Sequence, residues 1–208
     1  MPQYGSTHPT DLPAVADLFQ SAFPEALQAV FGKSRLPARA VEDIFRILFK
    51  NEPDGFIVAR EGSKIIGFVS VVHDLDRLHR RFLGWGGLYL LGHWCMGRYR
   101  GLGFVFLPRL LKAWWDYRST DDHPIKEKPM AQVLSIVVEK TFQGQGIGKI
   151  LSERALAYLR GTSARVVRLE VDAAKPVPIA LYRQLGFHEH ATIPSPRGPA
   201  LVMTLQLK

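Results

Sequence analysis

Apolar residues in the first fifty positions recur every three or four residues, which is the spacing of amphipathic helices. Thr10 or Asp11 can cap the first helix. The apolar positions of this helix are Val15, Leu18, Phe19 and Phe23. A second helix is predicted over about 39–50, and its apolar positions are Val41, Ile44, Phe45 and Leu48.

From residue 55 onward the pattern changes to short apolar runs. The stretch "GFIVAREGSKIIGFVSVVHD" predicts two strands joined by a tight turn at Glu61-Gly62-Ser63. Further on, strands are predicted at 132–138, 164–171 and 199–207, with helices at 149–160 and 177–187 between them. A parallel strand–helix–strand crossover is the default for such an order. The pattern therefore predicts a mixed sheet with helices on its faces.

Length and composition fit a single globular domain. The chain has 208 residues, 47% of them hydrophobic and 22% charged. Its one cysteine, Cys95, excludes an internal disulfide framework, and we expect a buried thiol there because the neighbours are apolar. No signal-peptide pattern opens the sequence, so we expect a cytoplasmic protein. The scattered histidines predict no metal site.

The formal charge of +8 is concentrated in one segment. Between Arg77 and Arg118 lie eight basic residues and one acid, so this stretch carries +7 of the total. General nucleic-acid binding would spread basic residues more widely, and the sequence disfavours it.

Three glycines stand at alternate positions where a strand passes into a helix, in "SIVVEKTFQGQGIGKIL" (135–151). Exposed backbone amides at a helix N-terminus form a site for phosphate. The P-loop pattern fails because Gln143 takes its first glycine position, and the dinucleotide fingerprint fails because Lys149 takes its third. The pattern that remains is Q-x-x-G-x-G, from Gln143 to Gly148.

With its flanking strand and helix, this motif resembles the acetyl-CoA motif of the GNAT superfamily of N-acetyltransferases, [QR]-x-x-G-x-[GA]. The later "LEV" strand and "IALYRQLGF" helix resemble the closing pattern of that superfamily, and the C-terminal half is similar to ribosomal-protein alanine N-acetyltransferases. The resemblance implies an α/β fold (an α+β mixed sheet) that is GNAT-like. In it, a central mixed β-sheet is flanked by helices, and a helical insertion lies between the third and fourth family strands. Two positions depart from the family: Lys175 replaces a common asparagine and Pro178 a common alanine.

The same resemblance implies a co-substrate, acetyl-CoA. The backbone of Ile136, Val137 and Val138 would bind its pantetheine arm. The residues implied around its pyrophosphate are Gln143, Gly144, Gln145, Gly146, Ile147, Gly148 and Lys149.

Acetyl transfer to a primary amine needs a proton acceptor for the amine and a proton donor for the departing thiolate. The resemblance places Tyr182 as the acid and Glu170 as the base, acting through water, with Glu139 as an alternative base. No residue resembles a dedicated acyl-enzyme nucleophile, so we expect direct attack in a ternary complex. The acceptor stays open, from a protein N-terminus to a small metabolite.

The resemblance does not explain the apolar, basic insertion at 77–130, which contains Trp85, Trp94, Trp114 and Trp115. It has three interpretations: a wall for the acceptor, a helical subdomain or contact between two copies of the chain, or a surface that docks on an anionic membrane. Its longest uncharged stretch, 82–97, is too short to span a bilayer. Alternative functions are a non-catalytic coenzyme-binding regulatory module, a membrane-surface-associated acyltransferase and, through the insertion, a nucleic-acid binder.

Overall fold

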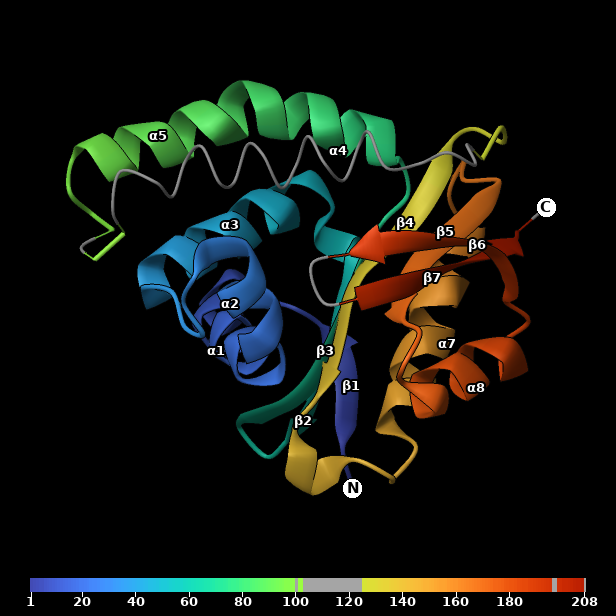
Figure 1. The fold of residues 1–208 in the computed structure, drawn as a ribbon. Coiled ribbons are helices and arrows are strands. Elements are labelled where there is room, and N and C mark those ends of the chain that lie inside the picture. The colour runs from blue at the N-terminus through green and yellow to red at the C-terminus, as the bar shows by residue number, and fades with distance from the viewer. Residues whose placement is uncertain (100, 103–124, 196–197, 208) are drawn as a thin grey trace.

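The computed structural model of the chain describes all residues except 100, 103–124, 196–197 and 208. Its centre is a seven-stranded mixed sheet in the order β1-β2-β3-β4-β5-β7-β6 (Figure 1). The strands are β1 (Gln3–Ser6), β2 (Phe56–Glu61), β3 (Lys64–Val72), β4 (Met130–Val138), β5 (Val166–Asp172), β6 (His188–Ser195) and β7 (Gly198–Gln206). Only the β4–β5 pair is parallel among the pairs described, as the crossover prediction requires.

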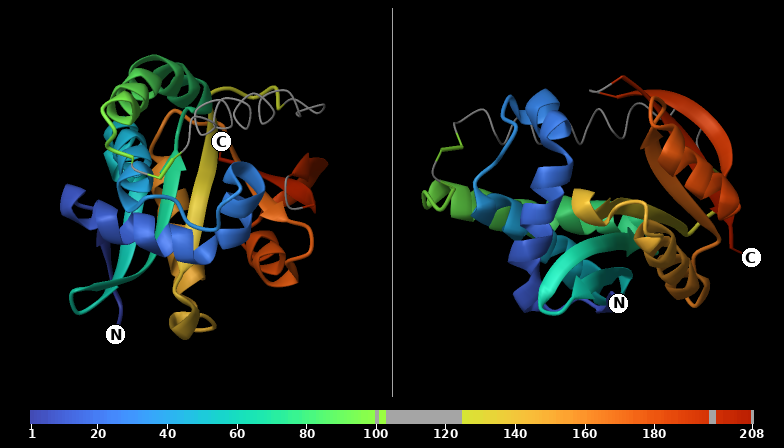
Figure 2. Two further views of the ribbon diagram at one scale, coloured as in Figure 1. Left: turned by 60° about the vertical axis from the view of Figure 1, so that its left-hand side comes forward. Right: turned by 90° about the horizontal axis from the view of Figure 1, so that it is seen from below.

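Helices cover both faces of this sheet (Figures 1 and 2). The helices of one face are α1 (Leu12–Ala22), α2 (Pro24–Phe31) and α3 (Ala38–Asn51), and those of the other are α7 (Ile147–Arg160) and α8 (Pro176–Gln184). A phenylalanine-rich core lies under the first group, where Phe45 contacts Phe68 of β3 edge-on at 5.7 Å. A second core joins α7 and α8 to the central strands.

The structure confirms the fold class and most of the predicted elements. Gly62 adopts a φ of +58° in the β2–β3 turn, a conformation that glycine takes without strain. The sequence patterns did not reveal β1, α2 or β6. The first is a four-residue edge strand, and the last, "HEHATIPS", is a largely polar edge strand that contains a proline.

The insertion begins with α4 (Leu75–Arg81), continues through a π-turn (Phe82–Gly86) and ends its described helical part with α5 (Gly87–Cys95). It is therefore helical from Arg77 to Cys95, while Trp114, Trp115 and the other residues of 103–124 lie outside the description. Figure 1 shows α4 and α5 running over α3, at the end of the sheet opposite the turn that follows β4.

A buried carboxylate ties the insertion to α3. Asp43 is fully buried and accepts hydrogen bonds from the hydroxyl of Tyr99 at 2.9 Å and from Nε of Arg98 at 3.1 Å. The expectation of a buried thiol in this segment is wrong. Cys95 is exposed because it ends α5, whose packed face is carried by Leu90.

Candidate coenzyme and transfer site

The two central strands β4 and β5 separate after a short paired stretch. Their pairing is confined to Met130, Ala131 and Gln132, which lie opposite Val166, Val167 and Arg168. The β3–β4 register shifts between Ser70 and Val71, so that Leu134 is an extra residue on β4. A bulge bends a strand, and here it coincides with the point where β4 leaves β5. The sheet thus has an internal fork.

The fork leaves one backbone edge of β4 without a neighbouring strand over 133–138. The amide of Glu139 donates to the carbonyl of Ile66 on β3 at 2.9 Å. Backbone groups alternate in direction along a strand. The backbone N–H and C=O of Val137 therefore also point to β3, whereas those of Ile136 and Val138 point to the open side. Of the three residues expected to bind pantetheine, these two have the suitable orientation. The carbonyl of Val138 accepts a hydrogen bond from Nε2 of Gln143 at 2.9 Å.

The glycine loop lies just past this open edge. Gly144 and Gly146 have φ values of +79° and +77°, which glycine adopts readily and other residues do not. A Cβ added at either position would meet no atom of the chain within 4 Å, so open space lies above both. At Gly148 an added Cβ would make only ordinary contacts, at 3.9 Å from Leu181 and Val138.

The amides at the start of α7 precede its intrahelical hydrogen bonds. The first intrahelical bond of α7 runs from the amide of Ile150 to the carbonyl of Gly146, at 3.1 Å. The amides of Ile147, Gly148 and Lys149 therefore precede the helical ladder and lie at the positive end of the helix dipole. Lys149 is exposed and stands 4.0 Å from Glu153. The loop is suited to bind a pyrophosphate, and the residues fit the coenzyme arm that the sequence implied.

Tyr182 lies at the fork, on the side of α7 and α8. Together with Val133 of β4 and Leu169 of β5 it lines a small apolar cavity, and its ring contacts Phe187 at 5.8 Å. The side chain is buried, and burial raises the pKa of its phenol to about 12. Tyr182 therefore keeps its proton throughout the neutral pH range.

Glu170 lies on the opposite face of β5. Leu169 packs in the same core as Tyr182, and side chains alternate along a strand, so Arg168 and Glu170 point to the other face. The carboxylate Oε1 of Glu170 is 3.1 Å from Nη2 of Arg168. The acid and base candidates thus approach the fork from its two sides.

The alternative base, Glu139, lies elsewhere. Its carboxylate accepts from Nζ of Lys64 at 2.7 Å and from the hydroxyl of Thr141 at 3.3 Å, beside the glycine loop. The structure brings Glu139 close to the phosphate end of the site and leaves Glu170 at the fork.

The structure also brings polar side chains to the fork that sequence analysis did not single out. Ser70 and Ser135 face each other across β3 and β4 with hydroxyls 2.7 Å apart, and Gln132 lies opposite Arg168. Gln132 and Ser135 are polar residues in the otherwise apolar run "QVLSIVV". Their presence in a strand expected to be buried could have marked them as candidate site residues.

None of the helices in the described part of the chain is both long and apolar enough to cross a membrane.

Comparison with known proteins gives a consistent result. Residues 109–187, which include the glycine loop and Tyr182, match the model of the Acetyltransferase (GNAT) family. The ribosomal protein bS18-alanine N-acetyltransferase of Salmonella typhimurium is 36% identical over 84 residues, which cover 37% of this chain and 56% of that protein. The mycothiol acetyltransferase of Thermobifida fusca is 37% identical over 60 residues, or 29% of this chain and 19% of that protein. The chain thus spans between 19 and 56% of the length of these curated relatives.

Solved structures share the fold. The ribosomal-protein-S18-alanine N-acetyltransferase of Escherichia coli superposes with a TM-score of 0.57 at 20% identity, covering 100% of this chain and 95% of that one. A putative acetyltransferase of Salmonella typhimurium, yncA, solved with acetyl-CoA, gives a TM-score of 0.61 at 15% identity, with coverages of 100% and 94%. These matches confirm the resemblance and the GNAT-like fold.

Proposed function

Since this chain carries the GNAT acetyltransferase segment on the fold of that family, we propose that it is an acetyl-CoA-dependent N-acetyltransferase acting on a primary amine. The observation that carries the proposal is the combination of the forked β4–β5 pair with the open glycine loop beyond it. A merely structural turn would need neither an unpaired strand edge nor open space above its glycines.

The chain's own groups divide the binding of the co-substrate between them. Acetyl-CoA supplies the acetyl group as a reactive thioester. The loop from Gln143 to Lys149 would hold its pyrophosphate through backbone amides, and the open edge of β4 at Ile136 and Val138 would hold its amide-bearing arm like an added strand. Both contacts direct the arm toward the fork.

At the fork, proton transfer falls to Glu170 and Tyr182. Glu170 would take a proton from the acceptor ammonium through a water molecule, which frees the nitrogen lone pair to attack the thioester carbonyl carbon. As the new C–N bond forms and the C–S bond breaks, the phenol of Tyr182 would donate a hydrogen bond and then its proton to the departing sulfur. Glu170 lies on one face of β5, and Tyr182 of α8 packs against the other. This arrangement suits a direct transfer in a ternary complex.

The relatives supply a first candidate for the acceptor. Two of the proteins compared are named for acetylating an alanine of a ribosomal protein. We take the α-amino group of a protein N-terminus as the first acceptor class to test, which would place the enzyme in the cytoplasm with its substrate. Lysine side chains and small amines form the other classes.

The test is an acceptor screen with thiol-release detection. Peptides with a free N-terminal alanine are compared with the same peptides blocked at the N-terminus, and with lysine-containing and small amines. Thiol release that requires both acetyl-CoA and a free amine supports the proposal. Acetyl-CoA binding by calorimetry without release on any amine would instead support the regulatory module, and no binding would contradict the proposal altogether.

A further inference from the structure

The outer face of the α4–α5 helix pair exposes large apolar side chains that the transfer site does not use. Trp85 is 86% exposed and Leu88 64%, with Leu83 and Met96 also exposed. They lie between residues 83 and 96, and Trp85 and Leu88 are three residues apart in sequence; we call these four exposed side chains the outer patch. The inner face of α5 packs against α3 through Leu90.

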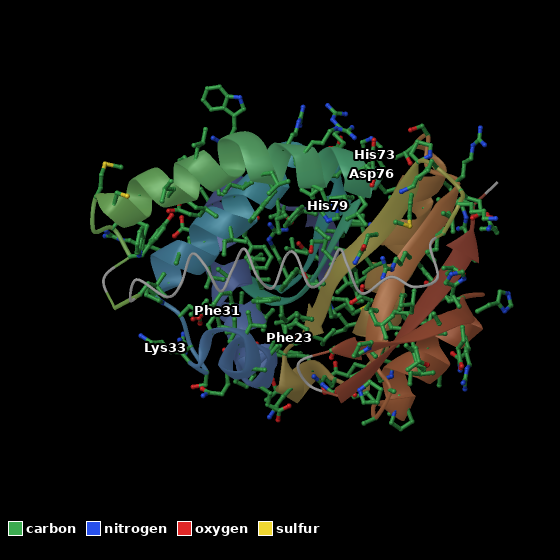
Figure 3. The ribbon with its side chains drawn as sticks, turned by 45° about the horizontal axis from the view of Figure 1, so that its top comes forward. Phe23, Phe31, Lys33, His73, Asp76 and His79 are labelled. Atoms are coloured by element: carbon green, nitrogen blue, oxygen red, sulfur yellow. The ribbon has the colours of Figure 1, made fainter. Side chains whose placement is uncertain are left out.

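Basic side chains continue the outer patch toward the N-terminus of α4. Arg77, Arg80 and Arg81 are exposed, and all three belong to α4. No acidic residue occurs between 77 and 99. Asp76, labelled in Figure 3 at the start of α4, is bound by Nζ of Lys128 at 2.8 Å, and this hydrogen bond lowers its pKa. The outer patch thus lies beside three exposed arginines, in a stretch of sequence without acids from 77 to 99.

This combination fits an anionic lipid surface. A helix lying in the plane of a membrane interface places tryptophan and leucine among the acyl chains and arginine among anionic headgroups. A protein partner would also bury apolar groups, but three exposed arginines beside them would then require matching acids. The charge complementarity favours lipid.

The position of the outer patch is compatible with coenzyme binding. In Figure 1, α4 and α5 lie along one side of the molecule, and the turn that follows β4 lies at the opposite side. A surface that touched α4 and α5 would leave the glycine loop in water.

We propose that the outer face of α4 and α5 docks the protein on anionic membrane surfaces, with Trp85 and Leu88 inserted and Arg77, Arg80 and Arg81 bound to headgroups. The docking is peripheral and does not require acetyl transfer.

The test is flotation of the full-length protein with vesicles of phosphatidylcholine alone or mixed with phosphatidylglycerol. We expect flotation with the mixed vesicles only, and its loss when salt is raised from about 0.1 M to about 1 M. Trp85→Ser and Leu88→Ser should each weaken partitioning about tenfold or more, since each removes a large apolar side chain that the membrane would bury. Arg80→Gln combined with Arg81→Gln should weaken it at least about tenfold.

Val177→Ser is the matched control, because Val177 is an apolar residue 79% exposed on α8, away from the outer patch. It should float like the wild type. Each variant is checked by thermal unfolding, and side chains this exposed should leave the midpoint unchanged. Brominated lipids should quench tryptophan fluorescence of the wild type more than that of Trp85→Ser.

Two results would overturn the docking proposal. The first is that the wild-type protein does not float with anionic vesicles. The second is that the Trp85→Ser and Leu88→Ser variants float as well as the wild type. If sedimentation shows that the chain self-associates, and Trp85→Ser abolishes this without any flotation, the outer patch pairs two copies and the lipid assignment is wrong.

Discussion

Gln132 of β4 and Arg168 of β5 are the last opposed residues before the two strands separate. Both side chains are buried although they are polar, and Arg168 contacts the carboxylate of Glu170 at 3.1 Å. Buried polar groups require partners, and Arg168 has one in Glu170. Arg168 lies beside Glu170, and Tyr182 lies across β5 from both, so the fork is the place where the proposed chemistry should be tested.

Replacing Tyr182 with phenylalanine tests the acid. The ring can keep its contact with Phe187, so only the hydroxyl is lost. We expect turnover to fall about 10²-fold while acetyl-CoA affinity stays nearly unchanged, measured by thiol release and calorimetry. Tyr158→Phe is the matched control, since Tyr158 is bonded to Glu52 and lies on α7. That variant should lose stability but keep turnover within about twofold. An unaltered rate in Tyr182→Phe would remove this residue from the mechanism.

Replacing Glu170 with glutamine tests the base. The amide cannot accept a proton, so kcat/KM near neutral pH should fall about 10²-fold and the acidic limb of its pH profile should disappear. Glu139→Gln removes the alternative carboxylate, which is paired with Lys64 beside the glycine loop. It should keep the wild-type limb. If the two variants exchange these behaviours, Glu139 is the base.

A branched side chain at Gly146 tests the coenzyme loop. Valine must adopt the φ of +77° there, which strains the backbone by about 1–3 kcal/mol, and its side chain would enter the open space above the loop. Gly146→Val should therefore abolish acetyl-CoA binding in a folded protein, as measured by calorimetry. The control is Gly97→Val, with a φ of +70° and equally open surroundings beyond α5. This variant should show the same strain in thermal unfolding and normal acetyl-CoA affinity, and equal loss of affinity in both would contradict a specific role for the loop.

Periodicity predicted the parts of the fold in which local pattern and tertiary environment agree. Helix α3 buries one face, and β2 and β3 are mostly buried apolar runs, so the sequence shows these elements directly. Edge strands such as β6 bury little, and their apolar signal is correspondingly weak. The exposure of Cys95 was missed because an apolar run does not reveal which of its faces meets the core.

The candidate site also has one part that local sequence predicts and one part that it does not. The glycine loop is local in sequence, so its spacing and positive φ requirements could be read from one motif. The fork is not local, because it depends on where β4 stops pairing with β5 and on the bulge at Leu134. Pairings of this kind are set by strands far apart in the chain, and Ser70, Ser135 and Gln132 therefore joined the site only in the structure.

Asp43 should hold the insertion in place. It is fully buried and accepts from Tyr99 and Arg98, and burial together with this hydrogen bond raises the pKa of Tyr99. Asp43→Ala leaves these donors without their acceptor and should lower the free energy of unfolding by about 1.5–3 kcal/mol in urea titrations. Glu42→Ala, one residue earlier, removes a partly exposed pair with Arg46 and should lower it by less than about 0.5 kcal/mol. Similar losses in both variants would mean that the buried carboxylate is not the anchor.

Burial of Tyr182 should also appear in the pH dependence of stability. Burial raises its pKa from 10.0 to about 12, so the unfolded chain releases this proton at lower pH than the folded chain. The stabilisation is therefore complete below pH 10 and is lost as the pH rises toward 12, at up to about 1.4 kcal/mol per pH unit. Tyr182→Phe lacks this proton, so its free energy of unfolding should fall less steeply over that interval, while the other tyrosines contribute equally to both proteins. Urea titrations at a series of alkaline pH values measure the difference, and parallel curves for the two proteins would show that the phenol is not buried in solution.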